Sequence, residues 1–194
     1  EKNYDVKYEE GNLTVTDRAV KYAIAMQAKS DTATYSGQEQ SASGFESDVF
    51  EFDGVKYTVS GLTATAKGTD AGTHEGSVEG TAVVTDPEGN DVTAQFVVTA
   101  QPGKLVIAKR DVTLRPVDAE KPYDGSALTA SEFEVAAGSF AEGEGVESCT
   151  YTGSQTLVGS SHSAIASATA LAGTNLEKNY DVKYEEGNLT VTDR

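Results

Sequence analysis

Residues 177–194, EKNYDVKYEEGNLTVTDR, decide the fold class of this chain, and residues 1–18 repeat them without a single change. From Tyr180 onward apolar and charged side chains alternate, which is the pattern of a strand with one buried face. The turn-forming stretch Glu-Glu-Gly-Asn interrupts this alternation, which then resumes with Leu189. Two alternating runs around a short polar turn predict a β-hairpin over 178–193.

A weaker repeat divides the interval between these two copies, which lie 176 residues apart. Residues 96–105 match residues 180–189 at an offset of 84, whereas the Tyr-Ser-Gly at 35–37 matches the Tyr-Asp-Gly at 123–125 at an offset of 88. Offsets that drift within a repeat indicate small insertions in loops. We therefore expect a terminal hairpin of a preceding repeat at 1–18, a first β domain at 19–109 and a second β domain at 110–194.

The rest of the chain also has the pattern of short strands and lacks a long segment of helical periodicity. A short helical turn is expected near 127–132 or 91–94. Short strands at this density predict an all-β fold made of two tandem, small immunoglobulin-like β-sandwich domains end to end, with β-grasp-like units as the alternative. The further strands that we expect lie at 21–28, 49–52, 56–59, 63–67, 77–85, 112–116, 132–135, 148–152 and 163–170.

The junctions between the expected domains contain neither glycine nor proline, the residues that make linkers flexible or kinked. Across the second junction the apolar positions change parity, from odd at Leu105 and Ile107 to even at Val112 and Leu114. A strand that changes its buried face at a fixed point passes from one core to another. The pattern predicts stiff joints and an elongated rod, and the hairpin at 1–18 is expected to pack on the first domain or to pair with a neighbouring chain.

Charge and composition exclude several classes of function. The formal net charge is −16, with 15 basic against 31 acidic residues, so a nucleic-acid binder that must neutralise phosphates is not expected. No apolar run is long enough to span a bilayer, so we expect no membrane insertion in this segment. The absence of an initial Met indicates a fragment of something larger. The single cysteine, Cys149, is expected to be a small buried apolar group.

The sequence offers little material for an active site or a metal site. His74 and His162 fall at corresponding, loop-like positions of the two repeats, and one histidine per domain does not make a triad or a zinc site. The stretch at 86–91 carries four oxygen-bearing side chains that could bind calcium, but it lacks the spacing of an EF-hand, and a plain hairpin turn is favoured. These weak metal candidates are Asp86, Glu88, Asn90 and Asp91. We expect no enzyme activity and no cofactor.

An intramolecular isopeptide bond would need a buried lysine that faces an amide or an acid. Lys21 or Lys121 with Asn179 or Asp181 could be imagined, but the strand alternation puts Asp181 and Lys183 on the solvent side, and solvated charges are favoured. The nine tyrosines could form a carbohydrate platform. Because most of them fall on the inward phase of the expected strands, core packing is the preferred interpretation.

Three motifs of the second domain carry a family resemblance. Asn179-Tyr-Asp-Val182 with the following Leu189-Thr-Val-Thr192, the turn Tyr123-Asp-Gly125, and Gly153-Ser-Gln-Thr156 together resemble the MBG and YDG repeat families of bacterial surface proteins. The first domain departs from the pattern, because it has Tyr35-Ser-Gly37 and a phenylalanine in place of the tyrosine. The resemblance implies a large, repetitive, cell-wall-attached adhesin at the bacterial cell surface, and it implies no catalytic residues.

Two functions follow as hypotheses. The first is a structural stalk that projects a distal binding region from the cell wall, with neighbouring repeats of the same chain as its partners. The second is a set of repeats that themselves bind host glycan, mucin or protein weakly and gain strength by avidity. An enzymatic role is the least supported, and it would require a pocket that joins His74 or His162 to an acid and a serine or threonine.

Overall fold

The structure is a computed structural model that describes residues 3–194, and nearly all of its regular structure is strand, which confirms the all-β prediction. The first half, residues 19–109, contains β1 (Tyr22–Gln27), β2 (Asp31–Thr34), β3 (Gln40–Ser43), β4 (Val49–Phe52), β5 (Val55–Gly68), β6 (Gly72–Glu75), β7 (Ser77–Thr85), the 3-10 helix η1 (Thr93–Gln95), β8 (Phe96–Gln101) and β9 (Lys104–Ala108). The second half, residues 110–194, contains β10 (Arg110–Pro116), β11 (Ala119–Pro122), β12 (Phe133–Gly138), β13 (Val146–Thr152), β14 (Gly159–Ala170), α1 (Leu176–Asn179), β15 (Tyr180–Tyr184) and β16 (Gly187–Thr192).

Each half is built around a parallel pairing between its first and its last strands. In the first half β1 pairs with β8 and β2 with β9, and in the second half β10 pairs with β15 and β11 with β16. The registers reproduce the offsets of the sequence repeat, since Asp31 lies opposite Leu105 and Ala119 lies opposite Leu189. Each half contains several sheets, consistent with a β-sandwich. The immunoglobulin-like and β-grasp assignments stay predictions.

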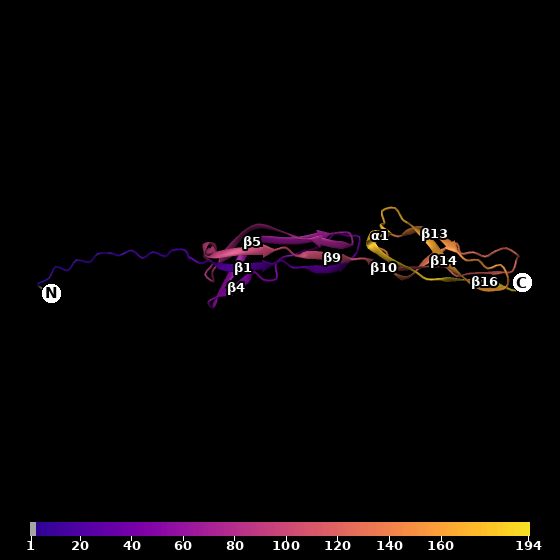
Figure 1. Ribbon diagram of the computed structural model, residues 1–194, viewed down its shortest axis with the longest axis horizontal. Helices are drawn as coiled ribbons and strands as arrows, with labels where there is room; N and C mark the ends of the chain where they lie inside the picture. Colours follow the sequence, from indigo (N-terminus) through magenta and orange to yellow (C-terminus); the bar gives the residue numbers. More distant parts are fainter. Residues whose placement is uncertain (1–2) are drawn as a thin grey trace.

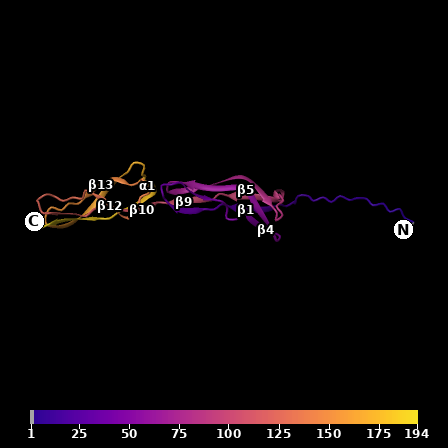
Figure 2. The ribbon, with the colours of Figure 1, turned by 180° about the vertical axis from the view of Figure 1, so that it is seen from behind.

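This topology makes the molecule elongated. When the first and last strands run parallel, the chain enters a half at one end and leaves it at the other end. The two halves accordingly lie end to end along the longest axis, with the C-terminus at the end of the second half (Figure 1), and the view from behind shows the same arrangement (Figure 2). The described residues therefore form a rod, as the sequence predicts.

The predicted hairpin at 178–193 is wrong. β15 and β16 do not pair with each other, because residues 180–192 run parallel to 110–122 in one continuous register, from Arg110 opposite Tyr180 to Pro122 opposite Thr192. The polar stretch between β15 and β16 moves the chain from one sheet to another without reversing it. Just before β15 the chain forms α1, which the sequence analysis missed.

The other strand predictions are confirmed with changes at their ends. The strands expected at 56–59 and 63–67 form the single strand β5, which carries a β-bulge near Gly61, where φ is 79° and the backbone of Thr81 leaves no room for a Cβ atom. Of the two sites proposed for a helical turn, only the one near 91–94 has one, as η1 at Thr93–Gln95. The strands β2, β3, β6 and β11 were missed, because four-residue strands carry little periodicity. The strands β8 and β9 were indicated only by the repeat match of 96–105 to 180–189.

Two hydrophobic clusters run along the rod. One lies inside the first half and consists of Ile24, Met26, Val59, Val84 and Phe96. The other crosses from the first half into the second and consists of Tyr35, Ala66, Leu105, Ile107, Val112, Leu114, Ala141, Ile165 and Tyr180. The predicted change of buried face is confirmed at this crossing, because β9 buries its odd positions and β10 its even ones. The expected separation of the two cores is wrong, since β9 and β10 contribute to one cluster.

The N-terminal segment is extended and projects away from the first half (Figure 1). From Tyr4 to Arg18 it contains neither strand nor helix, so the expected packing of a hairpin on the first domain is wrong. The segment meets the first half near its own end, where Gln95 accepts a hydrogen bond from the Arg18 amide at 2.7 Å and donates one to Asp17 at 2.7 Å. In the second half, β15 pairs with β10, and β16 pairs with β11 and β14, whereas residues 4–18 pair with no strand.

Candidate functional site

At the joint between the two halves, several side chains form hydrogen bonds between residues far apart in the sequence. The chain crosses it through one residue, Lys109, which separates β9 from β10. The ammonium of Lys109 donates to the carbonyl oxygen of Glu177 at 2.5 Å. Next in the chain, the Arg110 guanidinium donates to the carbonyl and the hydroxyl of Ser139 at 2.8 and 2.7 Å. Both residues around the crossing point are therefore anchored to the second half.

Glu144 ties a tyrosine of each half to one carboxylate. Tyr35 directly follows β2 of the first half, and its hydroxyl donates to Glu144 Oε1 at 2.5 Å. The Tyr180 hydroxyl, at the start of β15 in the second half, donates to Glu144 Oε2 at 2.7 Å and accepts from the Ala141 amide at 3.0 Å. The two rings meet edge to face with 5.5 Å between their centroids. Each oxygen of the Glu144 carboxylate therefore accepts a hydrogen bond from one tyrosine of the apolar cluster.

A second, more exposed contact also joins the two halves. Asp70, in the loop after β5, accepts from the Lys178 ammonium at 2.7 Å and from the Asn179 side-chain amide at 3.0 Å. Asn179 in turn accepts from the Ala71 amide at 2.9 Å and is itself buried. These hydrogen bonds, first from Lys178 and then from Asn179, lower the pKa of Asp70 below its ordinary value. Both residues belong to α1, so the short helix carries the contact.

The environment of the joint suppresses ionisation of both tyrosines. Burial, reinforced by the Glu144 carboxylate, raises the pKa of Tyr35 to about 12. Burial also raises the pKa of Tyr180 to about 12, and Glu144 adds to this effect while the Ala141 amide opposes it. Both values lie above the ordinary pKa of 10.0, so the folded joint favours the neutral phenols.

We expect alkali to weaken the joint. Because folding raises the tyrosine pKa, the stabilisation is fully present below pH 10 and is lost as the pH rises through 12. The free energy of unfolding, measured by urea titration at several pH values, should therefore fall between pH 10 and 12. A Tyr35→Phe/Tyr180→Phe variant should show a smaller fall over the same range. An equal fall in both proteins would show that other groups govern the alkaline limit.

Two of the four weak metal candidates, Asp86 and Asp91, accept hydrogen bonds from their own loop, whereas the Glu88 side chain is exposed. Asp86 Oδ1 accepts from the amides of Glu88 and Asn90 at 3.0 and 2.8 Å, and Oδ2 accepts from the Asn90 side chain at 2.9 Å. Asp91 Oδ1 accepts from the amide and hydroxyl of Thr93 at 3.0 and 2.6 Å. The side-chain and backbone bonds from Asn90 lower the pKa of Asp86, and those from Thr93 lower the pKa of Asp91. Among residues 3–194, acidic, histidine and cysteine side chains form no group of three that could hold a metal ion.

This loop is a turn, as predicted, but the strands around it do not form a ladder. Thr85 and Asp91 form a single antiparallel bridge across it. Beyond this bridge β7 pairs with β5, whereas β8 pairs with β1 in another sheet. The predicted turn is therefore confirmed, but the antiparallel pairing of a hairpin is limited to Thr85 and Asp91.

The two histidines do not occupy loops, and they are not equivalent. His74 lies on β6 opposite Leu105, and its Nε2 atom is 2.7 Å from the carbonyl oxygen of Asp70. His162 lies on β14 opposite Asn188, one position out of step with His74. A slip of one residue turns a strand side chain to the other face. His162 is accordingly exposed, 3.9 Å from Glu186, while His74 is half-buried.

The lysines considered for a crosslink do not face the expected partners. The Lys121 ammonium binds Asp124 at 2.7 Å and the carbonyl oxygen of Ser126 at 2.8 Å. Lys21 is exposed, and so are Asp181 and Lys183, as the alternation predicts. Asn179, the proposed amide partner, lies in the joint instead.

Cys149 is half-buried and packs against the cluster that crosses the joint, and burial raises the pKa of its thiol. This position fits the expected small apolar group. Among the tyrosines of the two halves, Tyr22, Tyr35, Tyr57, Tyr151 and Tyr180 pack in or against the clusters, whereas Tyr123 and Tyr184 are exposed.

The sequence pattern did not identify the residues of the joint as a functional site. Tyr35 was recognised only as part of a repeat motif, and Asp70 and Glu144 were not singled out for chemistry. One signal in the sequence pointed to Tyr35: it recurs as Tyr123 at the offset of 88, although the residues directly beside the two tyrosines differ.

Comparison of the chain with protein-family models, with curated proteins and with solved structures finds no match. Among residues 3–194, no helix is long and apolar enough to cross a membrane.

Proposed function

We propose that this chain is a spacer: tandem repeats of a stalk that project a distal binding region from a bacterial cell surface. The observation that carries the proposal is the end-to-end arrangement of two halves, each entered at one end and left at the other (Figure 1). A unit of this kind adds length each time it is repeated. The resemblance to MBG and YDG repeats supports the same function and its cell-wall location.

The construction of the joint supports a stiff spacer. A one-residue crossing leaves little freedom between β9 and β10, and the apolar cluster continues across it. Glu144 and Asp70 then bind groups on the opposite half. Independent domains on flexible linkers lack such shared packing. The acidic surface, with a net charge of −16, favours solubility in a crowded array.

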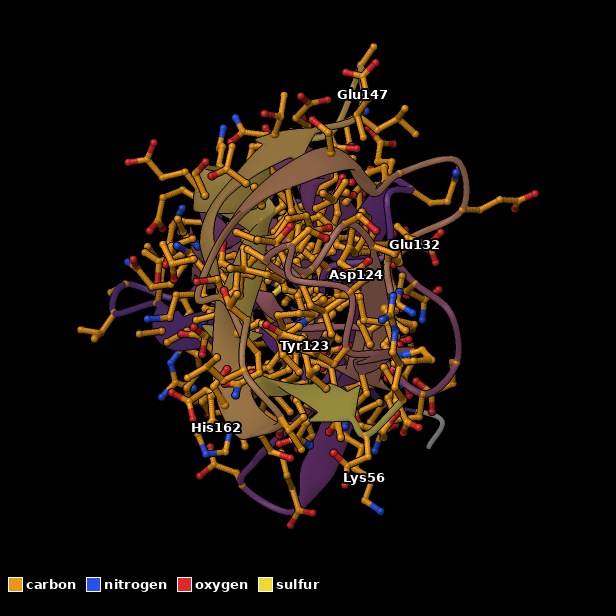
Figure 3. The ribbon with its side chains drawn as sticks, turned by 90° about the vertical axis from the view of Figure 1, so that its right-hand side faces the viewer. Lys56, Tyr123, Asp124, Glu132, Glu147 and His162 are labelled. Atoms are coloured by element: carbon orange, nitrogen blue, oxygen red, sulfur yellow. The ribbon has the colours of Figure 1, made fainter. Side chains whose placement is uncertain are left out.

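The alternative function, weak binding of glycan by every repeat, would be favoured by the same exposed aromatic surface in both halves. The matching tyrosines do not provide one, because Tyr35 is buried in the joint while Tyr123 is exposed at the far end of the second half. Figure 3 views that end along the rod, with Tyr123 and Asp124 near its centre and His162, Glu132 and Glu147 around it. The spacer is therefore the better-supported proposal.

Small-angle scattering and a spin-label distance measurement test the spacer directly. Strands rise by roughly 3.3 Å per residue, so the thirteen positions 22–34 and their counterparts 110–122 give about 85 Å for the two halves together, and the extended residues 3–18 add up to roughly 50 Å to the maximum dimension. Labels at exposed Glu79 and Glu147, introduced as cysteines in a Cys149→Ser background, should give one narrow distance distribution. A compact particle or a broad distribution would contradict the stiff spacer, and reproducible binding in a glycan and mucin screen would favour the alternative.

A further inference from the structure

We propose that residues 3–18 are a donor segment for a second copy of this chain: they bind the cleft of its second half wherever that copy's own residues 179–194 do not fill it. The basis is an identical sequence in two environments. In the C-terminal copy Tyr180 is 2% and Leu189 0% exposed, whereas the matching Tyr4 and Leu13 are 84% and 102% exposed. A row of apolar side chains in water marks a surface that has a partner.

The cleft is defined by what the C-terminal copy contacts. Its last strand, β16, lies between β11 and β14, with hydrogen bonds to both neighbours, and β15 pairs with β10. The strand positions can therefore be transferred to the donor segment directly. Tyr4 would stand opposite Arg110 of the second copy, and Leu13 opposite Ala119.

Side chains of the cleft recognise this sequence specifically. Asp118 accepts from the Asn188 amide at 2.8 Å, and Asp111 binds the Lys183 ammonium at 3.0 Å. Asn12 and Lys7 of the donor segment carry the same groups at the same spacing. A glycine is also required, because a Cβ atom at Gly187 would lie 2.6 Å from the carbonyl oxygen of Pro116. Gly11 provides it.

In the unaltered chain the attached C-terminal copy has the advantage. A segment joined to its own cleft competes at an effective concentration in the millimolar range, so a second copy with the same sequence does not displace it at micromolar concentration. The donor segment is expected to act only where a cleft is not filled by its own strands. This strand exchange does not depend on the spacer function, because it concerns which strands fill the second half.

The test disables the C-terminal copy within the full chain. A Leu189→Asp/Val191→Asp variant places two carboxylates in the core, so its residues 179–194 should leave the cleft. Residues 3–18 of another molecule can then enter. Because each molecule offers one donor segment and one open cleft at opposite ends, association is head to tail and continues along a chain. Analytical ultracentrifugation should show a mass that rises with concentration, while the unaltered chain stays monomeric.

The matched control carries the same changes in both copies. A Leu13→Asp/Val15→Asp/Leu189→Asp/Val191→Asp variant should stay monomeric, with its second half unfolded. Adding a peptide of residues 1–18 to this variant should restore the thermal transition of the second half, whereas a Gly11→Val peptide should not. The proposal is overturned if the control variant associates as well, or if the first variant stays monomeric and the peptide restores nothing.

Discussion

Replacing Leu189 by alanine is expected to lower the free energy of unfolding by about 3 kcal/mol, whereas the same replacement at Leu13 should change it by less than about 0.5 kcal/mol. The two leucines stand in identical stretches of eighteen residues, so helix or strand propensity cannot distinguish them. Leu189 is fully buried on β16 between β11 and β14, while Leu13 is surrounded by solvent. The difference between the variants therefore measures tertiary burial alone.

Urea unfolding of the two variants beside the unaltered chain checks this expectation. The Leu189→Ala variant should also show a lower midpoint for the second half than for the first, because its cavity lies in the second half. Equal loss of stability in both variants would mean that residues 3–18 pack against the chain in solution. No loss in either would mean that β16 is not part of a stable core.

The same pair of segments shows why the sequence predicts one part of this fold and not another. Alternation over 180–184 and 189–191 identifies strands correctly, because alternation reflects which side chains can be buried. Alternation does not say which strand is the partner. Residues 3–18 have the same pattern and form no strand, since their partners are absent from the first half. Burial and pairing are properties of the whole fold.

The wrong hairpin has a similar origin. Glu185-Glu-Gly-Asn188 has the composition of a reversing turn, and local residues alone favour a reversal. The parallel register with 110–122 requires instead that the chain continue in one direction. Gly187 serves this path by allowing close approach to Pro116, and it does not have a positive φ. A glycine in a turn-like stretch can therefore mark tight packing between strands.

The joint was predictable in its position but not in its chemistry. The change of parity between Leu105 and Val112 located the crossing within a few residues, because a change of buried face is visible in the order of apolar residues. Glu144 and Asp70 come from loops far from Lys109 in the sequence, and the glycine-rich, polar residues around them show no strand or helix periodicity. Only the folded chain shows that Glu144 binds a tyrosine from each half.

Replacing Tyr35 by alanine should loosen the joint and lower the free energy of unfolding by about 3 kcal/mol, the usual loss for a large buried aromatic side chain. Tyr35 is 5% exposed, packs edge to face on Tyr180 and donates to Glu144. Tyr123 is its matched control: it occupies the same place in the second half, follows β11 as Tyr35 follows β2, and is 38% exposed at the end of the rod. Its replacement by alanine should lower the free energy by less than about 1 kcal/mol.

The distance between labels at Glu79 and Glu147 separates loss of stiffness from loss of stability. In the Tyr35→Ala variant the distance distribution should broaden under conditions where both halves remain folded, because the apolar cluster and the Glu144 bridge are both interrupted at the crossing. In the Tyr123→Ala variant the distribution should stay as narrow as in the unaltered chain. If Tyr35→Ala reduced stability and left the distribution narrow, the one-residue crossing at Lys109 would be the main source of stiffness, and the side chains of the joint would serve stability alone.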